Sequence, residues 1–307
     1  MHIEEKTTEK ALKIRQNYPD FRHRNPMWWK KHGKNWKTIN GKSKMAKFSL
    51  KIIIRRGDYL TLQNFFVRYP KVAIAFSGGV DSAYLLYTAR QYAGDVCAYY
   101  VKSEFQPRFE LEDAVKLAES LCIELKIINL EILFVPCVKE NPPDRCYHCK
   151  KAIFTAIIDR ARADGFSVLL DGTNASDNIN DRPGIRALQE LSVFSPLREC
   201  GLTKSEIRRL SKEAGLFTWD KPAYACLATR ISAGEIITPE KLAATEAAED
   251  FLFSLGFRDF RVRSIDGNAK LQLVKAQWGL LEENREVILK KLKELYKTVV
   301  LDLEVRG

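Results

Sequence analysis

Short apolar runs and longer amphipathic segments alternate along the chain between residues 59 and 171. The segments with helical spacing of apolar residues are 59–69, 82–92, 111–121 and 147–163. The apolar runs that have the length of buried strands are 72–76, 96–101, 125–130 and 167–171. This alternation predicts an α/β fold, a doubly wound parallel sheet with helices on both faces.

The pattern changes near residue 238. Thr238 and Pro239 have the residue types of an N-cap and a first helical position, and Gly256 ends the predicted helix. Two strands follow around a turn at 266–267, then a helix at 283–296 and a strand at 299–303. This order predicts a small C-terminal α+β lobe. We therefore expect three parts, at residues 1–58, 59–237 and 238–307.

The turn after the first strand reads SGGVDS, residues 77–82. A helix N-terminus offers unpaired N–H groups and a positive dipole end, so a phosphate binds there readily. Two glycines let the main chain approach a ligand, two serines add hydroxyl donors, and the Asp can cap the helix or bind Mg²⁺. No Walker A lysine is present. An ordinary two-glycine turn is the competing interpretation. The predicted nucleotide-binding residues are Ser77, Gly78, Gly79, Val80, Asp81 and Ser82.

A long polar loop follows the last predicted strand of the sheet, from Asp171 to Gly184. It starts at the carboxyl end of that strand, the edge where ligands of α/β sheets bind. We assign Gly172 and Asp177 of this loop to the nucleotide site. A solvated loop is the alternative. Residues 203–206 then form a capping box that starts a helix to about residue 214.

The excess of positive charge lies in one place. Residues 1–58 hold 16 of the 50 basic and 5 of the 39 acidic residues, so the remainder carries 34 of each. Trp28, Trp29 and Trp36 stand among lysines there, a pattern that can bind nucleic acid. We favour a poorly ordered extension, or upstream sequence translated from too early a start, with Met45 as the natural one. The neutral remainder argues against nucleic acid as the substrate.

Seven cysteines without a secretory signal are more often thiols, metal ligands or catalytic groups than disulfides. Cys146 and Cys149 form a C-x-x-C pair at a predicted helix start, where the dipole stabilises thiolates. Cys226 is the third candidate, whereas Cys97 and Cys122 have the character of small core residues. Three thiolates would leave one iron of a [4Fe–4S] cluster open for sulfide. A thiol pair with an unrelated Cys226 is the alternative.

Several motifs together resemble one family. They are SGGVDS at 77–82, CYHCKK at 146–151, DGTN at 171–174, DRPGIRAL at 181–188 and CLATR at 226–230. The loop is similar to that of PP-loop ATP pyrophosphatases, and the combination resembles LarE-family ATP-dependent sulfur transferases. The resemblance implies adenylation of a carboxylate of a pyridinium biscarboxylate mononucleotide and insertion of sulfur, in nickel-pincer cofactor biosynthesis.

The same resemblance implies roles for further residues. Arg182, Arg230, Arg261 and Arg263 would meet phosphate or carboxylate groups, and Cys226 and Glu249 would be catalytic. One family branch gives up the sulfur of a single cysteine at the position of Cys226. Another carries an iron–sulfur cluster, here on Cys146, Cys149 and Cys226. The implied cofactors are ATP, Mg²⁺ and a [4Fe–4S] cluster.

The chain departs from the family pattern near the substrate. Ser232 and Ala233 replace a Pro-Tyr pair, and Ile265 and Gln272 replace a His and a Glu. The sulfur acceptor is therefore open. The alternatives are a tRNA-thiolating enzyme and an ATP-dependent amide ligase. No apolar run reaches the roughly 18 residues of a membrane helix, so we expect a cytoplasmic enzyme with a small-molecule substrate and a sulfide donor. A homo-oligomer is compatible with the sequence.

Overall fold

The computed structural model of the chain describes residues 61–178 and 183–305, all within a compact unit of residues 54–307. The basic extension and Arg182 lie outside the described residues, and the predicted domain boundaries stay predictions. The helices are α2 (Leu62–Arg68), α3 (Val80–Tyr92), α4 (Arg108–Ser120), α5 (Pro136–Lys139), α6 (Arg145–Ala163), α7 (Pro183–Glu190), α8 (Pro196–Glu199), α9 (Lys204–Glu213), α10 (Pro239–Ser254), α11 (Trp278–Glu283) and α12 (Arg285–Leu292). Short 3-10 helices are η2 (Ile132–Phe134), η3 (Leu227–Arg230) and η4 (Lys275–Gln277).

Two sheets are formed by seven strands of the described residues. These strands are β1 (Lys71–Ala75), β2 (Asp95–Lys102), β3 (Glu124–Asn129), β4 (Leu169–Leu170), β5 (Arg261–Ile265), β6 (Asn268–Gln272) and β7 (Val299–Leu301). The first sheet is parallel throughout, in the order β3-β2-β1-β4, which confirms the predicted α/β class. Strand order reverses between β1 and β4, and ligands bind at such a switch point. The 77–82 turn and the 171–178 loop both follow strands that meet there.

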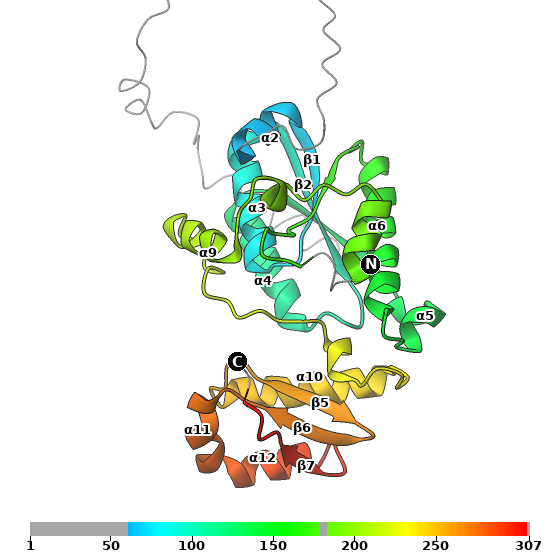
Figure 1. Cartoon of the computed structure of the whole chain (residues 1–307), viewed down its shortest axis with the longest axis vertical. Helices are drawn as coiled ribbons and strands as arrows, with labels where there is room; N and C mark the ends of the chain where they lie inside the picture. The colour runs from blue at the N-terminus through cyan, green and yellow to red at the C-terminus, as the bar shows by residue number, and fades with distance from the viewer. Residues whose placement is uncertain (1–60, 179–182, 306–307) are drawn as a thin grey trace, which may run out of the picture. The chain divides into compact units, whose positions relative to one another are not determined.

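The side chains of alternate strand residues belong to two hydrophobic cores, one on each face of the parallel sheet. Val72 and Ile74 belong to a cluster with residues of α2, α3 and α4, whereas Ala73 belongs to a cluster with residues of α6. In Figure 1, α6 lies on the opposite side of β1 and β2 from α3 and α4. Helices thus cover both faces, so β1 and β2 are buried on two sides and read as nearly continuous apolar runs, whereas β3 at the edge of the sheet is partly exposed.

The second sheet has the order β5-β6-β7 and packs on α10 and α12. Asp266 and Gly267 both have positive φ, 49° and 79°, which is the geometry of a tight hairpin turn. The predicted turn is confirmed. The helix predicted at 283–296 corresponds to the shorter α12, and the separate helix α11 precedes it and ends at Glu283.

One sequence prediction about local structure was wrong. Cys122 is exposed rather than buried, because it sits with φ of 52° in the turn after α4. Cys97 is buried, as predicted. The strand predicted at 167–171 is confirmed as the shorter β4, Leu169–Leu170, since the chain then leaves the sheet to begin the polar loop. None of the helices within residues 61–178 and 183–305 has the length and apolar character needed to cross a lipid bilayer.

Candidate active site

The SGGVDS turn is held by its own serines. Ser77 N donates to Ser82 Oγ at 3.3 Å, the two serine hydroxyls are 3.1 Å apart, and Ser82 Oγ donates to Gly79 O at 3.1 Å. Gly78 has φ of +71°, a conformation in which a Cβ would be strained and only 3.1 Å from Glu110 O. The turn is therefore a fixed cradle at the N-terminus of the 13-residue helix α3.

The loop after β4 packs directly against this cradle. A Cβ at Gly172 would lie 2.9 Å from Ser82 N, so only glycine permits the approach. Asp177 lies at the far end of the loop, where its Oδ2 accepts from Asn174 N at 3.0 Å. Arg198 of α8 donates to Asp177 O at 2.7 Å. The structure thus brings Gly172 to the nucleotide turn and uses Asp177 to brace the loop.

Asp81 is paired with a lysine that sequence reasoning missed. Lys204 Nζ lies 2.6 Å from Asp81 Oδ2, whereas Asp81 Oδ1 is buried and has no hydrogen-bond partner among the described residues. The Lys204 backbone N–H donates to Ser176 Oγ at 3.0 Å, and the predicted capping box of Thr203 and Glu206 starts α9 there. An orphaned buried carboxylate oxygen at a phosphate cradle fits a Mg²⁺ ligand.

A second lysine links the nucleotide turn to the segment that carries Cys226. Lys221 Nζ lies 2.6 Å from Asp113 Oδ2 and 3.5 Å from Gly78 O. Arg208 of α9 holds the same segment by donating to Lys221 O at 2.7 Å. Lysines 204 and 221 thus place positive charge beside a turn that contains none. Their distance along the chain from residues 77–82 explains why the motif gave no sign of them.

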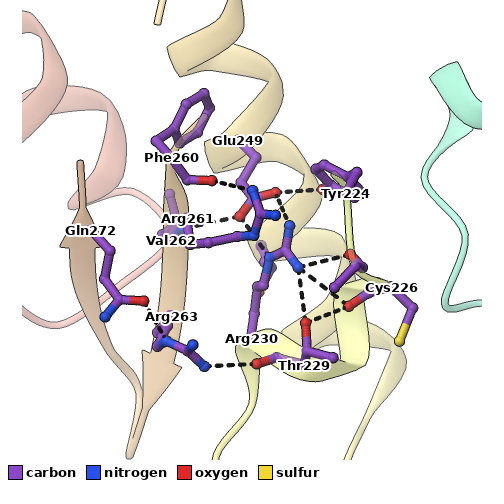
Figure 2. A network of polar contacts seen from close by, with 12 residues as sticks. Tyr224, Cys226, Thr229, Arg230, Glu249, Phe260, Arg261, Val262, Arg263 and Gln272 are labelled. Carbon is purple, nitrogen blue, oxygen red and sulfur yellow. Dashed lines mark hydrogen bonds and ion pairs between the residues drawn. The ribbon is translucent and has the colours of Figure 1, made fainter. Parts of the chain in front are cut away.

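Glu249 and Arg230 form a buried ion pair in which both side chains are 1% exposed (Figure 2). Arg230 Nε donates to Glu249 Oε1 at 2.8 Å and Nη2 donates to Oε2 at 3.0 Å. Arg230 Nη1 donates to Ala225 O at 2.7 Å and to Cys226 O at 3.4 Å. Arg230 therefore anchors the cysteine segment, and it links that segment to Glu249. The predicted catalytic role of Glu249 and the substrate role of Arg230 stay predictions.

The other two arginines also belong to this network. Arg261 donates to Phe260 O at 2.6 Å and to Ala223 O at 2.7 Å. Arg263 donates to Gln272 Oε1 at 2.5 Å and to Thr229 O at 2.9 Å. Gln272, a departure from the family pattern, thus positions Arg263. The predicted contacts of these arginines with a substrate remain untested.

Tyr224 closes the network from the side of the cysteine segment. Its hydroxyl donates to Glu249, and its ring faces the guanidinium of Arg230, 4.5 Å from the centroid. Burial, followed by the negative charge of Glu249, raises the pKa of Tyr224 well above its usual value. The hydroxyl therefore keeps its proton and serves as a donor. Figure 2 shows the sulfur of Cys226 pointing away from this buried network.

The three predicted cysteines gather around another residue that the sequence did not reveal, Arg145 at the start of α6. Arg145 Nη1 lies 3.8 Å from Cys226 Sγ, and Nη2 lies 3.5 Å from Cys146 Sγ. Cys149 is buried, and burial, followed by the charge of Cys226, raises the pKa of its thiol to about 12. The helix dipole predicted a stabilised thiolate, but for Cys149 burial outweighs the dipole.

These thiols have the donor chemistry of an iron–sulfur site, because Cys thiolates are the ligands that hold such clusters. Within the described residues, however, no three His, Cys, Asp or Glu side chains are grouped closely enough to hold a metal ion. The residue types fit a cluster, whereas their present spacing does not. Assembly of a cluster would require the three thiols to move closer together.

Glu110 is a further titratable group at this site that sequence reasoning missed. It lies on α4, whose backbone contacts Gly78. Burial raises the pKa of its carboxyl to about 7, an effect that Lys221 and Arg230 oppose and Asp113 reinforces. A carboxyl of this kind can exchange a proton near neutral pH. Nothing in the motif pattern indicated Glu110, because only the packing of α4 on the turn brings this carboxyl to the site.

Comparison with known proteins assigns the chain to a family. No protein-family model matches it. An uncharacterized protein from Synechocystis sp. is 36% identical over 250 residues, which are 79% of this chain and 92% of that protein. The pyridinium-3,5-bisthiocarboxylic acid mononucleotide synthase of Lactiplantibacillus plantarum is 34% identical over 236 residues, which are 76% of this chain and 86% of that enzyme. The chain belongs to the LarE-like family of PP-loop sulfur transferases.

The tRNA-specific 2-thiouridylase MnmA of Thermotoga sp. (strain RQ2) is a more distant relative of this LarE-like chain. It is 28% identical over 188 residues, which are 48% of this chain and 52% of that enzyme. The LarE-like protein is therefore an enzyme of the ATP-dependent sulfur-transferring class, as predicted. The four-stranded sheet with the SGGVDS turn at its switch point is consistent with the PP-loop fold.

Proposed function

We propose that this LarE-like enzyme adenylates a carboxylate of a small molecule similar to pyridinium biscarboxylate mononucleotide and replaces one of its oxygens with sulfur. The pathway would be nickel-pincer cofactor biosynthesis or a related one. The match to the L. plantarum synthase over most of both chains supports this substrate class. The observation that carries the proposal is the contact of Lys221 with Gly78 O, because it joins the phosphate cradle to the segment of Cys226.

The first step would be attack of the substrate carboxylate on the α-phosphorus of ATP. An acyl–adenylate forms, and pyrophosphate leaves with the electron pair of the broken P–O bond. The N–H groups of the turn and Lys204 would bind the phosphates, and Asp81 would hold Mg²⁺. Mg²⁺ supplies charge neutralisation of the leaving pyrophosphate.

The second step would be attack of a sulfur anion on the adenylated carbonyl carbon. A C–S bond forms, the C–O bond to AMP breaks, and AMP leaves with that electron pair. We propose Cys146, Cys149 and Cys226 as ligands of a [4Fe–4S] cluster, which would supply an iron without a protein ligand where sulfide can bind. Loss of the sulfur of Cys226 itself is the competing route.

Thiolation of tRNA is the second candidate, since the MnmA relatives match about half of the chain. An amide ligase is the third, but it would have no need of three cysteines. Pyrophosphate release, measured with ATP, Mg²⁺ and each acceptor in turn, distinguishes the three candidate functions. We expect stimulation by the pyridinium biscarboxylate mononucleotide. Stimulation by tRNA alone, or amide formation with ammonia in place of sulfide, would refute the proposed function.

A further inference from the structure

Lys221 lies where the nucleotide turn meets the segment that leads to Cys226. Its Nζ is 2.6 Å from Asp113 Oδ2 and 3.5 Å from Gly78 O, and it faces the ring of Phe109 at 5.3 Å from the centroid. A lysine ammonium has three donors, and no third acceptor for this one is found within the described residues. Lys221 can therefore donate to a ligand bound at the turn.

The ammonium is held in place and is still reached by solvent. The Lys221 side chain is 16% exposed, and that of Asp113 is 32% exposed. Arg208 of α9 fixes the backbone that carries the lysine, because it donates to Trp219 O and to Lys221 O, both at 2.7 Å. Asp113 belongs to α4, which packs on the turn at Gly78. The cation thus has a defined position within reach of a ligand.

The two lysines of the site lie against different parts of the turn. Lys204 contacts Asp81 in the first turn of α3. Lys221 contacts Gly78, which precedes that helix. The N–H groups at the start of α3 are the natural site of the leaving pyrophosphate. The α-phosphorus of the adenylate is joined to the acyl oxygen, so it must lie between the pyrophosphate and the cysteines. Lys221 carries positive charge in that direction, since its segment continues to Cys226.

The pair of Lys221 and Asp113 is one that a phosphate can enter. Water reaches both side chains, so the ion pair by itself contributes little to stability. A phosphate oxygen that accepts from a lysine forms a charge-assisted hydrogen bond, which is shorter and stronger than a neutral one. The ammonium can make this bond while it keeps its contact with Gly78 O, because it has three donors.

We propose that Lys221 is a catalytic residue that donates a hydrogen bond to a non-bridging oxygen of the α-phosphoryl group, in ATP and in the acyl–adenylate. This inference rests on the proposed function. As the substrate carboxylate oxygen bonds to the α-phosphorus, the P–O bond to pyrophosphate breaks, and pyrophosphate takes the electron pair. The ammonium stabilises negative charge on the non-bridging oxygens at this phosphorus, and it keeps its proton throughout. The same contact orients the adenylate towards the segment of Cys226.

The test compares the binding of AMP, adenosine and pyrophosphate by the anaerobically purified protein. Isothermal titration calorimetry gives the three dissociation constants, and only AMP carries the α-phosphate. Wild type should bind AMP more tightly than adenosine. Lys221→Met should raise the dissociation constant of AMP on the order of tenfold, the loss expected for one charge-assisted contact, and leave those of adenosine and pyrophosphate unchanged. Lys221→Arg should keep part of the preference for AMP.

Two further substitutions serve as controls. Lys116→Met removes an exposed lysine of α4 that contacts the ring of Phe217, and this variant should bind AMP as wild type does. Asp113→Asn removes the carboxylate beside Lys221 and should tighten AMP binding severalfold. This gain should be smaller when Lys221 is also replaced by Met, because the two residues act on the same phosphate. Circular dichroism and the thermal unfolding midpoint verify the fold of each variant.

Two results would overturn the inference. One is a preference for AMP over adenosine that is absent in wild type or fully retained in Lys221→Met. The other is weaker binding of AMP by folded Asp113→Asn, which is expected if the ion pair only maintains the structure. The second result decides the question even if Lys221→Met does not fold.

Kinetics separate this inference from the proposed function. With the pyridinium biscarboxylate mononucleotide as acceptor, Lys221→Met should lower kcat for pyrophosphate release on the order of 100-fold, the effect of losing one donor to developing charge. A wild-type kcat refutes the role of Lys221 while leaving sulfur transfer intact. Absence of any thiocarboxylate product, with the preference for AMP still dependent on Lys221, refutes the proposed function alone.

Discussion

Lys204 Nζ lies 2.6 Å from Asp81 Oδ2, although the two residues are 123 positions apart in the chain. The contact ties the first turn of α9 to the nucleotide turn. It leaves Asp81 Oδ1 buried without a partner among the described residues. A Walker A loop carries its own lysine next to the phosphates. Here the lysine is Lys204 of another helix, α9. It can neutralise Asp81 before a nucleotide and its metal ion bind.

Asp81→Asn should lower the rate of pyrophosphate release by about 100-fold or more, equivalent to roughly 3 kcal/mol in the barrier, because the amide has no charge for Mg²⁺. The rate is measured by coupled pyrophosphate detection, and circular dichroism verifies the fold. Asp95→Asn is the matched control, since that exposed carboxylate pairs with Lys71 at a distance of 3.0 Å outside the turn. Release at the wild-type rate from folded Asp81→Asn would contradict the assignment.

The Arg230–Glu249 pair should be essential to the stability of the cysteine segment. Glu249→Gln leaves Arg230 buried and uncompensated, which should cost about 3–5 kcal/mol in the free energy of unfolding. Denaturation by urea measures this loss. Arg230→Met combined with Glu249→Leu removes both charges and should recover much of it. A loss of less than about 1 kcal/mol in the single variant would show that the pair is not a structural anchor.

Stability should depend on pH through Glu110. The folded pKa of about 7 lies above the ordinary value of 4.5, so the folded state retains a proton that the unfolded state loses. The contribution of the protonated Glu110 carboxyl to the free energy of unfolding is fully present below pH 4.5, and it is lost as the pH rises to 7. Glu110→Gln should therefore equal wild type at pH 4.5 and exceed it at pH 8 by on the order of 2–3 kcal/mol. The same difference at both pH values would show that Glu110 ionises normally.

Cys146, Cys149 and Cys226 should act as one unit. Replacing any one with Ser should lower bound iron sharply and abolish sulfur transfer, while substrate-dependent pyrophosphate release persists at the separate nucleotide turn. Cys97→Ser should leave iron unchanged, since Cys97 is buried in the core on the α6 face of the sheet.

Intact-mass analysis of the protein after one turnover tests the competing route. If Cys226 gives up its own sulfur, it should become dehydroalanine, and only its replacement should matter. An unmodified Cys226 together with unchanged iron in Cys146→Ser and Cys149→Ser would contradict both routes.

The sequence predicted the parallel sheet and the turn at residues 77–82, because both depend on local patterns. Apolar runs of strand length mark β1 to β3, and two glycines between a strand and a helix mark the cradle. The predicted β5–β6 hairpin also formed, since Asp266 and Gly267 favour the positive φ that its turn needs.

The residues that complete the site could not be predicted in this way. Lys204, Lys221 and Arg145 act through charge across segments that are distant in the chain, and no spacing rule connects them. Arg230 stands in a family motif, which suggested contact with a ligand. The structure shows its donors directed to Glu249 and to backbone carbonyls, which only tertiary packing decides.

The central claim is that the enzyme moves sulfur onto a small-molecule carboxylate at the expense of ATP. The most direct test is mass spectrometry of the small molecule after incubation with the enzyme, ATP, Mg²⁺ and isotope-labelled sulfide. We predict a product in which one carboxylate oxygen is replaced by sulfur, formed together with AMP and pyrophosphate and absent without ATP. An acceptor that stays unchanged while ATP is consumed, or labelled sulfur found only in tRNA, would contradict the account.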